Sequence, residues 1–284
     1  MRNYILWLLN DTNPYRDDYL QLTGIYKMSE LSGYWLEGIY SDAIQHELAN
    51  YLGALNAYFF FEVISDNLAI GLASPNNNDN QQQNERRTAL KKFNDVMQQK
   101  LKGDTRPILE LLSSISHLVN SISCFDQSLA ATEARKLASE YTKQTDISIN
   151  ELEHATLSYL ALNIASCLEA YELVADHPIA TSILNSLISR YSAVNTLLDM
   201  EKTITITTLT QCGTKTILVV PTLLYIISAI DKIKPNPNLP NVINNGSLLM
   251  AVRKASCLIR LQNDIGTPLL ISDSNSRNLL KQKC

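Results

Sequence analysis

Hydrophobic residues recur three or four positions apart along most of the chain, and clean alternation of apolar and polar residues is rare. This spacing is typical of amphipathic helices, so the sequence predicts an all-α fold. One long helix is predicted to follow Ser41 and to extend through the apolar segment after it. A second helix covers residues 86–102 and ends at Gly103, and a third covers residues 107–123.

The second half of the chain begins with a helix-start signal. Ser148 and Glu151 form a capping box, which predicts a helix running into the apolar segment that follows. That helix is apolar on nearly every side, as expected of a central element. A further helix is predicted after Pro178. The fifteen-residue apolar run 216–230 contains Pro221 and is interpreted as a buried core helix, since it is short for a membrane span.

Three segments interrupt this helical pattern. Residues 74–86 form a polar low-complexity run, which predicts a flexible surface loop within a single domain that spans 1–284. Residues 203–209 alternate β-branched positions, but an isolated short strand has nothing obvious to pair with, so we interpret them as an irregular or helical turn. Residues 234–241 are a Pro- and Asn-rich loop before the last helix.

Composition narrows the class of protein. With 284 residues, 45% hydrophobic and 18% charged, the chain can build a sizeable core, and we expect a soluble, cytoplasmic protein without a membrane span. The net charge of -4 provides no basic stripe for nucleic acid, and no GxGxxG or P-loop motif occurs. The widely spaced cysteines predict reduced thiols. They are Cys124, Cys167, Cys212, Cys257 and Cys284.

The candidate chemistry lies near the end of the chain, in the run RLQNDIGT. Arg260, Asn263, Asp264 and Thr267 share one face of a helix. Such a face is either a solvated surface near a helix end or a ligand site. The four histidines are dispersed along the sequence, so neither an HExxH zinc site nor a histidine-paired nucleophile is indicated.

RLQNDIGT resembles the second metal-binding motif of class I terpene synthases. In that family an Arg-Leu-x-Asn-Asp-Ile/Leu-Gly-Thr/Ser run is followed by a glutamate. Residues 210–233 also resemble the broken helix that precedes the motif, with Cys212, Gly213 and Thr214 at the break. On these two pieces, about 60 residues, the chain is similar to an atypical or degenerate member of the family. The resemblance implies a class I terpenoid synthase-like helical bundle.

The resemblance also implies roles for individual residues. Asn263 and Thr267 would bind Mg²⁺, a cation that prefers oxygen ligands. Arg260 would be catalytic and would bind the diphosphate of a prenyl diphosphate with its planar fork of donors. Lys215, behind Gly213, is a second candidate for diphosphate binding, and its alternative interpretation is a lone surface lysine.

The chain departs from the family pattern at several positions. The family's glutamate position falls on Ile271, and Pro268 is expected to bend or end the helix. No DDxxD motif occurs, and the best candidates for its metal-binding carboxylates are Glu62 and Asp66, with Val63 at the second acidic position. The alternative is a polar edge on a long helix.

Two further places offer incomplete versions of these motifs. Asp126 is a single carboxylate at a more usual spacing from the second motif. Asn195 and Asp199, four residues apart, imitate the second motif itself.

Together these features predict a lyase of isoprenoid biosynthesis. It would ionise and cyclise geranyl, farnesyl or geranylgeranyl diphosphate in a Mg²⁺-dependent reaction and release diphosphate. A homodimer is compatible with the sequence. The alternative is a non-catalytic relative, or an unrelated helical scaffold that binds a protein partner.

Overall fold

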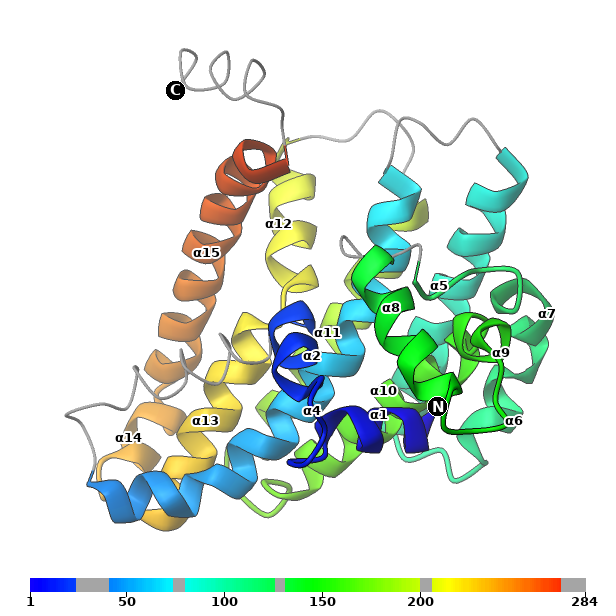
Figure 1. Cartoon of the computed structure of the whole chain (residues 1–284). Coiled ribbons are helices and arrows are strands. Elements are labelled where there is room, and N and C mark those ends of the chain that lie inside the picture. Colours follow the sequence, from blue (N-terminus) through cyan, green and yellow to red (C-terminus); the bar gives the residue numbers. More distant parts are fainter. Residues whose placement is uncertain (24–40, 74–79, 126–130, 200–205, 272–284) are drawn as a thin grey trace.

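A computed structural model shows a bundle built from helices (Figure 1). The residues it describes are 1–23, 41–73, 80–125, 131–199 and 206–271. Every regular element within these ranges is a helix, which confirms the predicted all-α class. The helices are α1 (Arg2–Leu9), α2 (Arg16–Thr23), α4 (Asp42–Ala73), α5 (Asn80–Leu101), α6 (Ile108–Leu112), the 3₁₀ turn η1 (Ser113–Ile115), α7 (Ser116–Val119), α8 (Ala131–Thr142), α9 (Ile149–Glu153), α10 (Thr156–Glu172), α11 (Ala180–Asp199), α12 (Ile206–Thr216), α13 (Val219–Ile233), α14 (Leu239–Asn244) and α15 (Ser247–Ile271).

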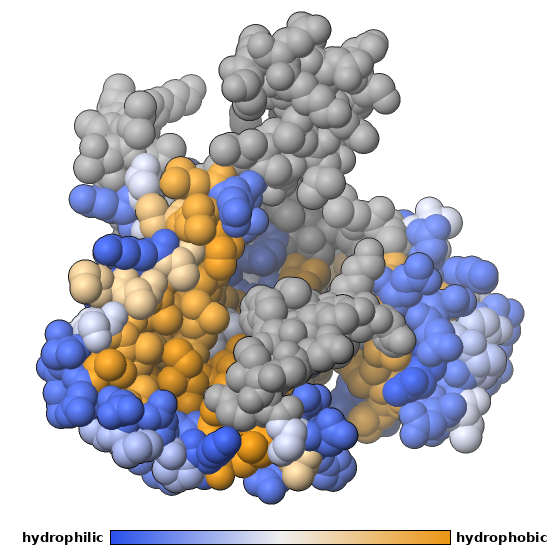
Figure 2. Space-filling model, turned by 90° about the vertical axis from the view of Figure 1, so that its left-hand side faces the viewer, coloured by the Kyte–Doolittle hydropathy of each residue, from blue (hydrophilic) through white to orange (hydrophobic). Residues whose placement is uncertain are grey.

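The centre of the bundle is the packing of α4 along α10. Helices α5 and α13 flank α4, and α11 packs against α5, α12 and α13. Helix α15 lies at one edge, on α12 and α13 (Figure 1), and the surface on that side shows a broad apolar area (Figure 2). The apolar character of α10 therefore predicted its central place correctly.

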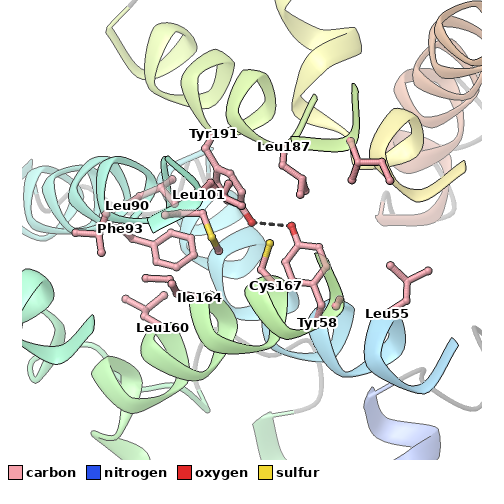
Figure 3. Close-up of a cluster of buried hydrophobic side chains, with 14 of the residues drawn as sticks. Leu55, Tyr58, Leu90, Phe93, Leu101, Leu160, Ile164, Cys167, Leu187 and Tyr191 are labelled. Carbon is pink, nitrogen blue, oxygen red and sulfur yellow. Dashed lines mark hydrogen bonds between the residues drawn. The ribbon is translucent and has the colours of Figure 1, made fainter. Parts of the chain in front are cut away.

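The main core lies between α4, α5, α10, α11 and α13. Phe93 and Tyr191 meet edge to face at 6.0 Å, and Leu160 and Ile164 of α10 close the same layer (Figure 3). A smaller cluster joins α1, α2, α8 and α9, with Tyr4 and Tyr141 at its centre.

Most of the predicted helices are confirmed, with shifts at their ends. The long helix after Ser41 is α4, and α11 begins two residues after Pro178. Helix α5 begins at Asn80, so residues 80–86, which were predicted to be part of a loop, are helical. Glutamine, glutamate and arginine are good helix formers, and Gln81 donates a 3.1 Å hydrogen bond to Glu85 one turn later. Residues 74–79 of that loop lie outside the described residues.

Two predicted helices are broken in the structure. Residues 107–123 form α6, η1 and α7 instead of one helix, and Ser113 Oγ at the first break donates to the backbone oxygen of Glu110. Such back-bonding competes with a regular helix. The capping box of Ser148 and Glu151 is confirmed, but the helix it opens ends at Glu153, and α10 restarts at Thr156.

The break before the last long helices is displaced from its predicted position. Helix α12 continues through residues 212–214, and the chain bends by 43° between α12 and α13, near Leu218. Within the described residues no single helix is long and apolar enough to cross a membrane, although α12 and α13 together reach that length and apolarity. The helix was predicted to bend or end at Pro268, and α15 continues through this residue to Ile271.

The capping box provides a test of the local structure. Replacing Ser148 by Ala removes the hydrogen bond that its Oγ accepts from the Glu151 amide, so we expect the free energy of unfolding to fall by about 1 kcal/mol. Urea unfolding followed by circular dichroism measures this change. Ser158→Ala, at an exposed position of α10, is the control and should change stability by less than about 0.5 kcal/mol. Equal effects of the two substitutions would contradict the role of the cap.

Candidate functional site

The two segments that resemble the terpene synthase pattern lie side by side. Helix α15 packs against α12, and Ser256 Oγ donates a 2.9 Å hydrogen bond to the backbone oxygen of Thr214. One turn further along α15, the half-buried Arg260 crosses Gly213, where an added Cβ would lie 3.5 Å from Arg260 Nε. Any larger side chain at Gly213 would compete with Arg260 for this space.

The other predicted residues of this region lie around that contact. Lys215 is exposed in the last turn of α12, and Asn263 is exposed on α15 one turn beyond Arg260. Thr267 belongs to α15, but its side chain is outside the described residues. The structure therefore brings Arg260 to the α12–α15 contact and leaves Asn263 open to solvent.

The carboxylates predicted on α4 have different surroundings. Glu62 is 3% exposed and points into the core, whereas the side chain of Asp66, one turn later, is 62% exposed. Partial removal of the carboxyl group from water raises the pKa of Asp66 to about 6. The positive charge of Arg190 acts in the opposite direction, and the negative charge of Glu62 raises the pKa further. Because most of the side chain remains in water, solvent screens these interactions, and the protonation of Asp66 has little effect on the free energy of unfolding.

Four side chains from three helices bind the carboxylate oxygens of Glu62 through an ion pair and hydrogen bonds. Arg190 of α11 forms an ion pair with Oε1, and Ser65 Oγ donates to the same oxygen at 3.0 Å. Asn163 Nδ2 of α10 donates to Oε2 at 2.9 Å, and Tyr191 OH donates to it at 3.0 Å. A buried carboxylate is tolerated only when it is paired and hydrogen-bonded, and Glu62 meets both conditions.

A second tyrosine extends this network. Tyr58 and Tyr191 place their hydroxyl oxygens 2.7 Å apart (Figure 3). Since the proton of Tyr191 is directed at Glu62, Tyr58 is the donor in this pair. Burial raises the pKa of both phenols well above its usual value, so both stay protonated.

Arg190 is the cation of the cluster and is 4% exposed. Its Nη2 also reaches Asp66 Oδ1 at 3.2 Å, and its Cζ lies 4.5 Å from the centre of the Tyr191 ring. Burial is the largest single influence and would lower the pKa of Arg190, but Glu62, Asp66 and the two tyrosines together outweigh it and raise the pKa above its usual value. The guanidinium stays charged and pairs with two of the carboxylates of α4, Glu62 and Asp66.

This arrangement does not fit Glu62 as a ligand of a divalent cation. A metal at Glu62 would have to displace Arg190 and two or more hydrogen-bond donors. Asp66 is more accessible, because Arg190 contacts it through one oxygen only and at longer range. In the described ranges no group of three or more His, Cys, Asp or Glu side chains gathers in a way that could hold a metal ion.

The remaining candidates are engaged elsewhere or fall outside the described ranges. Asn195 accepts from Asn94 at 2.8 Å and donates to Asp95 at 2.7 Å, and Asp199 accepts from Lys91 at 2.6 Å. These contacts fasten α11 to α5. Asp126 lies outside the described residues.

A small apolar cavity lies beside the network, between α4, α10, α11 and α13. Its volume is about 20 Å³, enough for about one water molecule. Tyr58, Cys167, Leu187 and Tyr225 are among its lining residues, several of them drawn in Figure 3. The cavity is too small for a prenyl chain as it stands.

Sequence reasoning missed Arg190, the residue that organises the cluster. Its only signal is a single arginine in the otherwise apolar and small-residue segment SLISRYSAV of α11. Comparison of the chain with protein-family models, with curated proteins and with solved structures gave no match.

Arg190 provides a test of the cluster. Arg190→Met leaves Glu62 buried without its cation, so we expect the free energy of unfolding at pH 7 to fall by about 3–5 kcal/mol. An unpaired buried carboxylate favours the protonated state in the fold, so the variant should be relatively more stable near about pH 5 than near about pH 8. Guanidinium chloride unfolding at several pH values measures both effects.

Two further variants control this experiment. Arg87→Met removes an exposed arginine with a 4.0 Å contact to Asp199 and should cost less than about 1 kcal/mol. Glu62→Gln combined with Arg190→Met removes both charges and should recover part of the loss. An Arg190→Met variant as stable as Arg87→Met at every pH would show that the ion pair does not hold the core together.

Proposed function

We propose that the chain is a terpene synthase-like enzyme that binds a prenyl diphosphate with Mg²⁺ and releases diphosphate. The observation that supports this function is the contact between α12 and α15, in which Arg260 of the RLQNDIGT run lies on Gly213 of the preceding helix. Two segments that match the family pattern only in sequence are thus neighbours in space.

The residues at this contact have suitable chemistry for a diphosphate. Arg260 carries a planar fork of donors that suits phosphate oxygens, and Lys215 adds an exposed positive charge at the end of α12. Asn263 and Thr267, four residues apart on α15, would provide the amide and hydroxyl oxygens for Mg²⁺. When bound, the metal would neutralise the charge of the leaving diphosphate.

On α4 we assign Asp66, and not Glu62, as the carboxylate available to a metal. Asp66 is largely exposed and is held by Arg190 at 3.2 Å through one oxygen. Glu62 instead positions Arg190, which in turn fixes α4 against α11. This assignment keeps one of the two predicted α4 ligands and gives the other a structural role.

A second candidate function is a helical protein that catalyses nothing. The contacts of Glu62 favour this second candidate. Both carboxylate oxygens of Glu62 are already bound by protein groups, so only one of the two predicted ligands on α4 is left to bind a metal. The small size of the cavity beside Tyr58 favours it as well.

An activity assay tests the two candidates. The purified full chain is incubated with geranyl, farnesyl or geranylgeranyl diphosphate, with Mg²⁺ or with EDTA, and both hydrocarbon products and released diphosphate are measured. The enzyme proposal predicts Mg²⁺-dependent product. Asn263→Ala removes a proposed metal ligand and should lower kcat/KM at least about tenfold, because mutating even a residue that only orients a metal ligand lowers metal affinity or activity by about 10–100-fold.

Gln262→Ala is the matched control, since Gln262 is the exposed neighbour of Asn263 on a different face of α15. It should leave kcat/KM within about twofold of the unmodified chain. If none of the three substrates gives a product or Mg²⁺-dependent diphosphate release, the enzyme proposal fails and the non-catalytic protein remains.

A further inference from the structure

Helix α15 has an outer face that no described helix covers. Met250, Leu258 and Leu261 are 54%, 58% and 49% exposed, although they are large apolar side chains. Their spacing places them on one side of the helix, opposite the buried Val252 and Ser256 that face α12 and α13. The outer side of α15 is therefore an apolar stripe in contact with solvent.

Figure 2 looks directly at this side of the molecule. It shows a broad apolar area with hydrophilic side chains to its left and below it. Single exposed leucines are common on protein surfaces, but a contiguous apolar area with a polar border is typical of an interaction site. We therefore expect the stripe on α15 to bind a partner surface.

The charge of this part of the chain indicates which kind of occupant fits. Residues 206–271, from α12 through α15, contain six basic residues and two acidic residues, Asp231 and Asp264, for a formal charge of +4. The whole chain has a charge of -4, so the rest of it is acidic. Helix α15 contains three basic residues and one acidic residue, Asp264, which follows the last leucine of the stripe.

Two of these cations lie at the stripe itself. Lys254 is exposed between Met250 and Leu258 on the same face, and Arg253 is exposed at its edge. Lysine and arginine can lay their apolar stems along a hydrophobic surface while their charged ends reach toward phosphate groups. Apolar side chains interleaved with cations are the pattern of a helix that lies at the surface of an anionic membrane.

We propose that the outer face of α15 docks the protein on an anionic lipid surface. Met250, Leu258 and Leu261 enter the boundary between headgroups and acyl chains, and Arg253 and Lys254 contact lipid phosphates. The helix lies on the membrane and does not cross it. This binding is independent of whether the chain has enzymatic activity.

A second copy of the chain fits the same face less well. A twofold contact through the stripe would bring the Lys254 side chains of both copies into one apolar interface, and residues 250–261, which carry the stripe, offer no carboxylate to pair with them. Anionic headgroups supply the missing negative charge.

Vesicle flotation with the full chain tests the proposal. One set of vesicles is phosphatidylcholine, and the other contains about 30% phosphatidylserine, a typical anionic lipid. We expect the protein to bind the phosphatidylserine vesicles at least about tenfold more tightly than the phosphatidylcholine vesicles. Raising the salt concentration should weaken binding to the phosphatidylserine vesicles. The double substitution Leu258→Gln, Leu261→Gln should reduce binding at least about tenfold, because it removes most of the inserted surface.

Leu109→Gln is the matched control, since Leu109 is 57% exposed, like Leu258, but belongs to α6. It should leave vesicle binding unchanged, and circular dichroism verifies that all variants keep their helices. No binding to phosphatidylserine vesicles, or an equal loss with Leu109→Gln, would overturn the proposal. So would a dimer in sedimentation that dissociates on the double substitution, because the stripe would then be an interface between two copies.

Discussion

The ion pair between Arg190 and Glu62 is the interaction on which the arrangement of the central helices depends. Moving two charges out of water is costly, and their attraction offsets this cost only when the remaining hydrogen-bonding positions are also filled. Here Asn163 of α10 and Tyr191 of α11 both donate hydrogen bonds to the second carboxylate oxygen of Glu62. The carboxylate on α4 is therefore satisfied only when α4, α10 and α11 take this one register. Apolar packing alone would tolerate small shifts between the helices, whereas this network does not.

The same network changes the meaning of the acidic residues on α4. Two carboxylates four residues apart on a helix can hold a metal ion, but they can equally hold a guanidinium. Local sequence does not distinguish these cases, because Arg190 is 124 residues away from Asp66 along the chain. The structure decides between them for Glu62, whose oxygens are all used within the protein. Of the two carboxylates predicted as metal ligands on α4, only the exposed Asp66 therefore remains available for the proposed site.

Helix positions were predictable from sequence where the apolar spacing was long and regular, as in α4, α11 and α13. They were less predictable where short-range polar contacts compete with the helix, as at Ser113, or where helix formers extend a polar run, as at the start of α5. The break before α13 was predicted from a family pattern at residues 212–214, but it lies nearer Leu218. The family pattern singled out Arg260 and Gly213 separately, but their contact is visible only in the structure. The role of Arg190 likewise arises from long-range packing, which periodicity does not encode.

The charge of the chain is unevenly distributed, and the net charge alone does not show this. A total of -4 argues against a polyanionic partner when it is read for the whole chain, yet the segment from α12 into α15 is strongly basic. This segment contains both Arg260, directed at α12, and the exposed apolar stripe on the outer side of α15. A prenyl diphosphate combines an apolar chain with an anionic head, and an anionic membrane surface has the same two properties. Positive charge beside apolar surface suits both ligands, so one feature of α15 supports the diphosphate proposal on its inner side and the membrane proposal on its outer side.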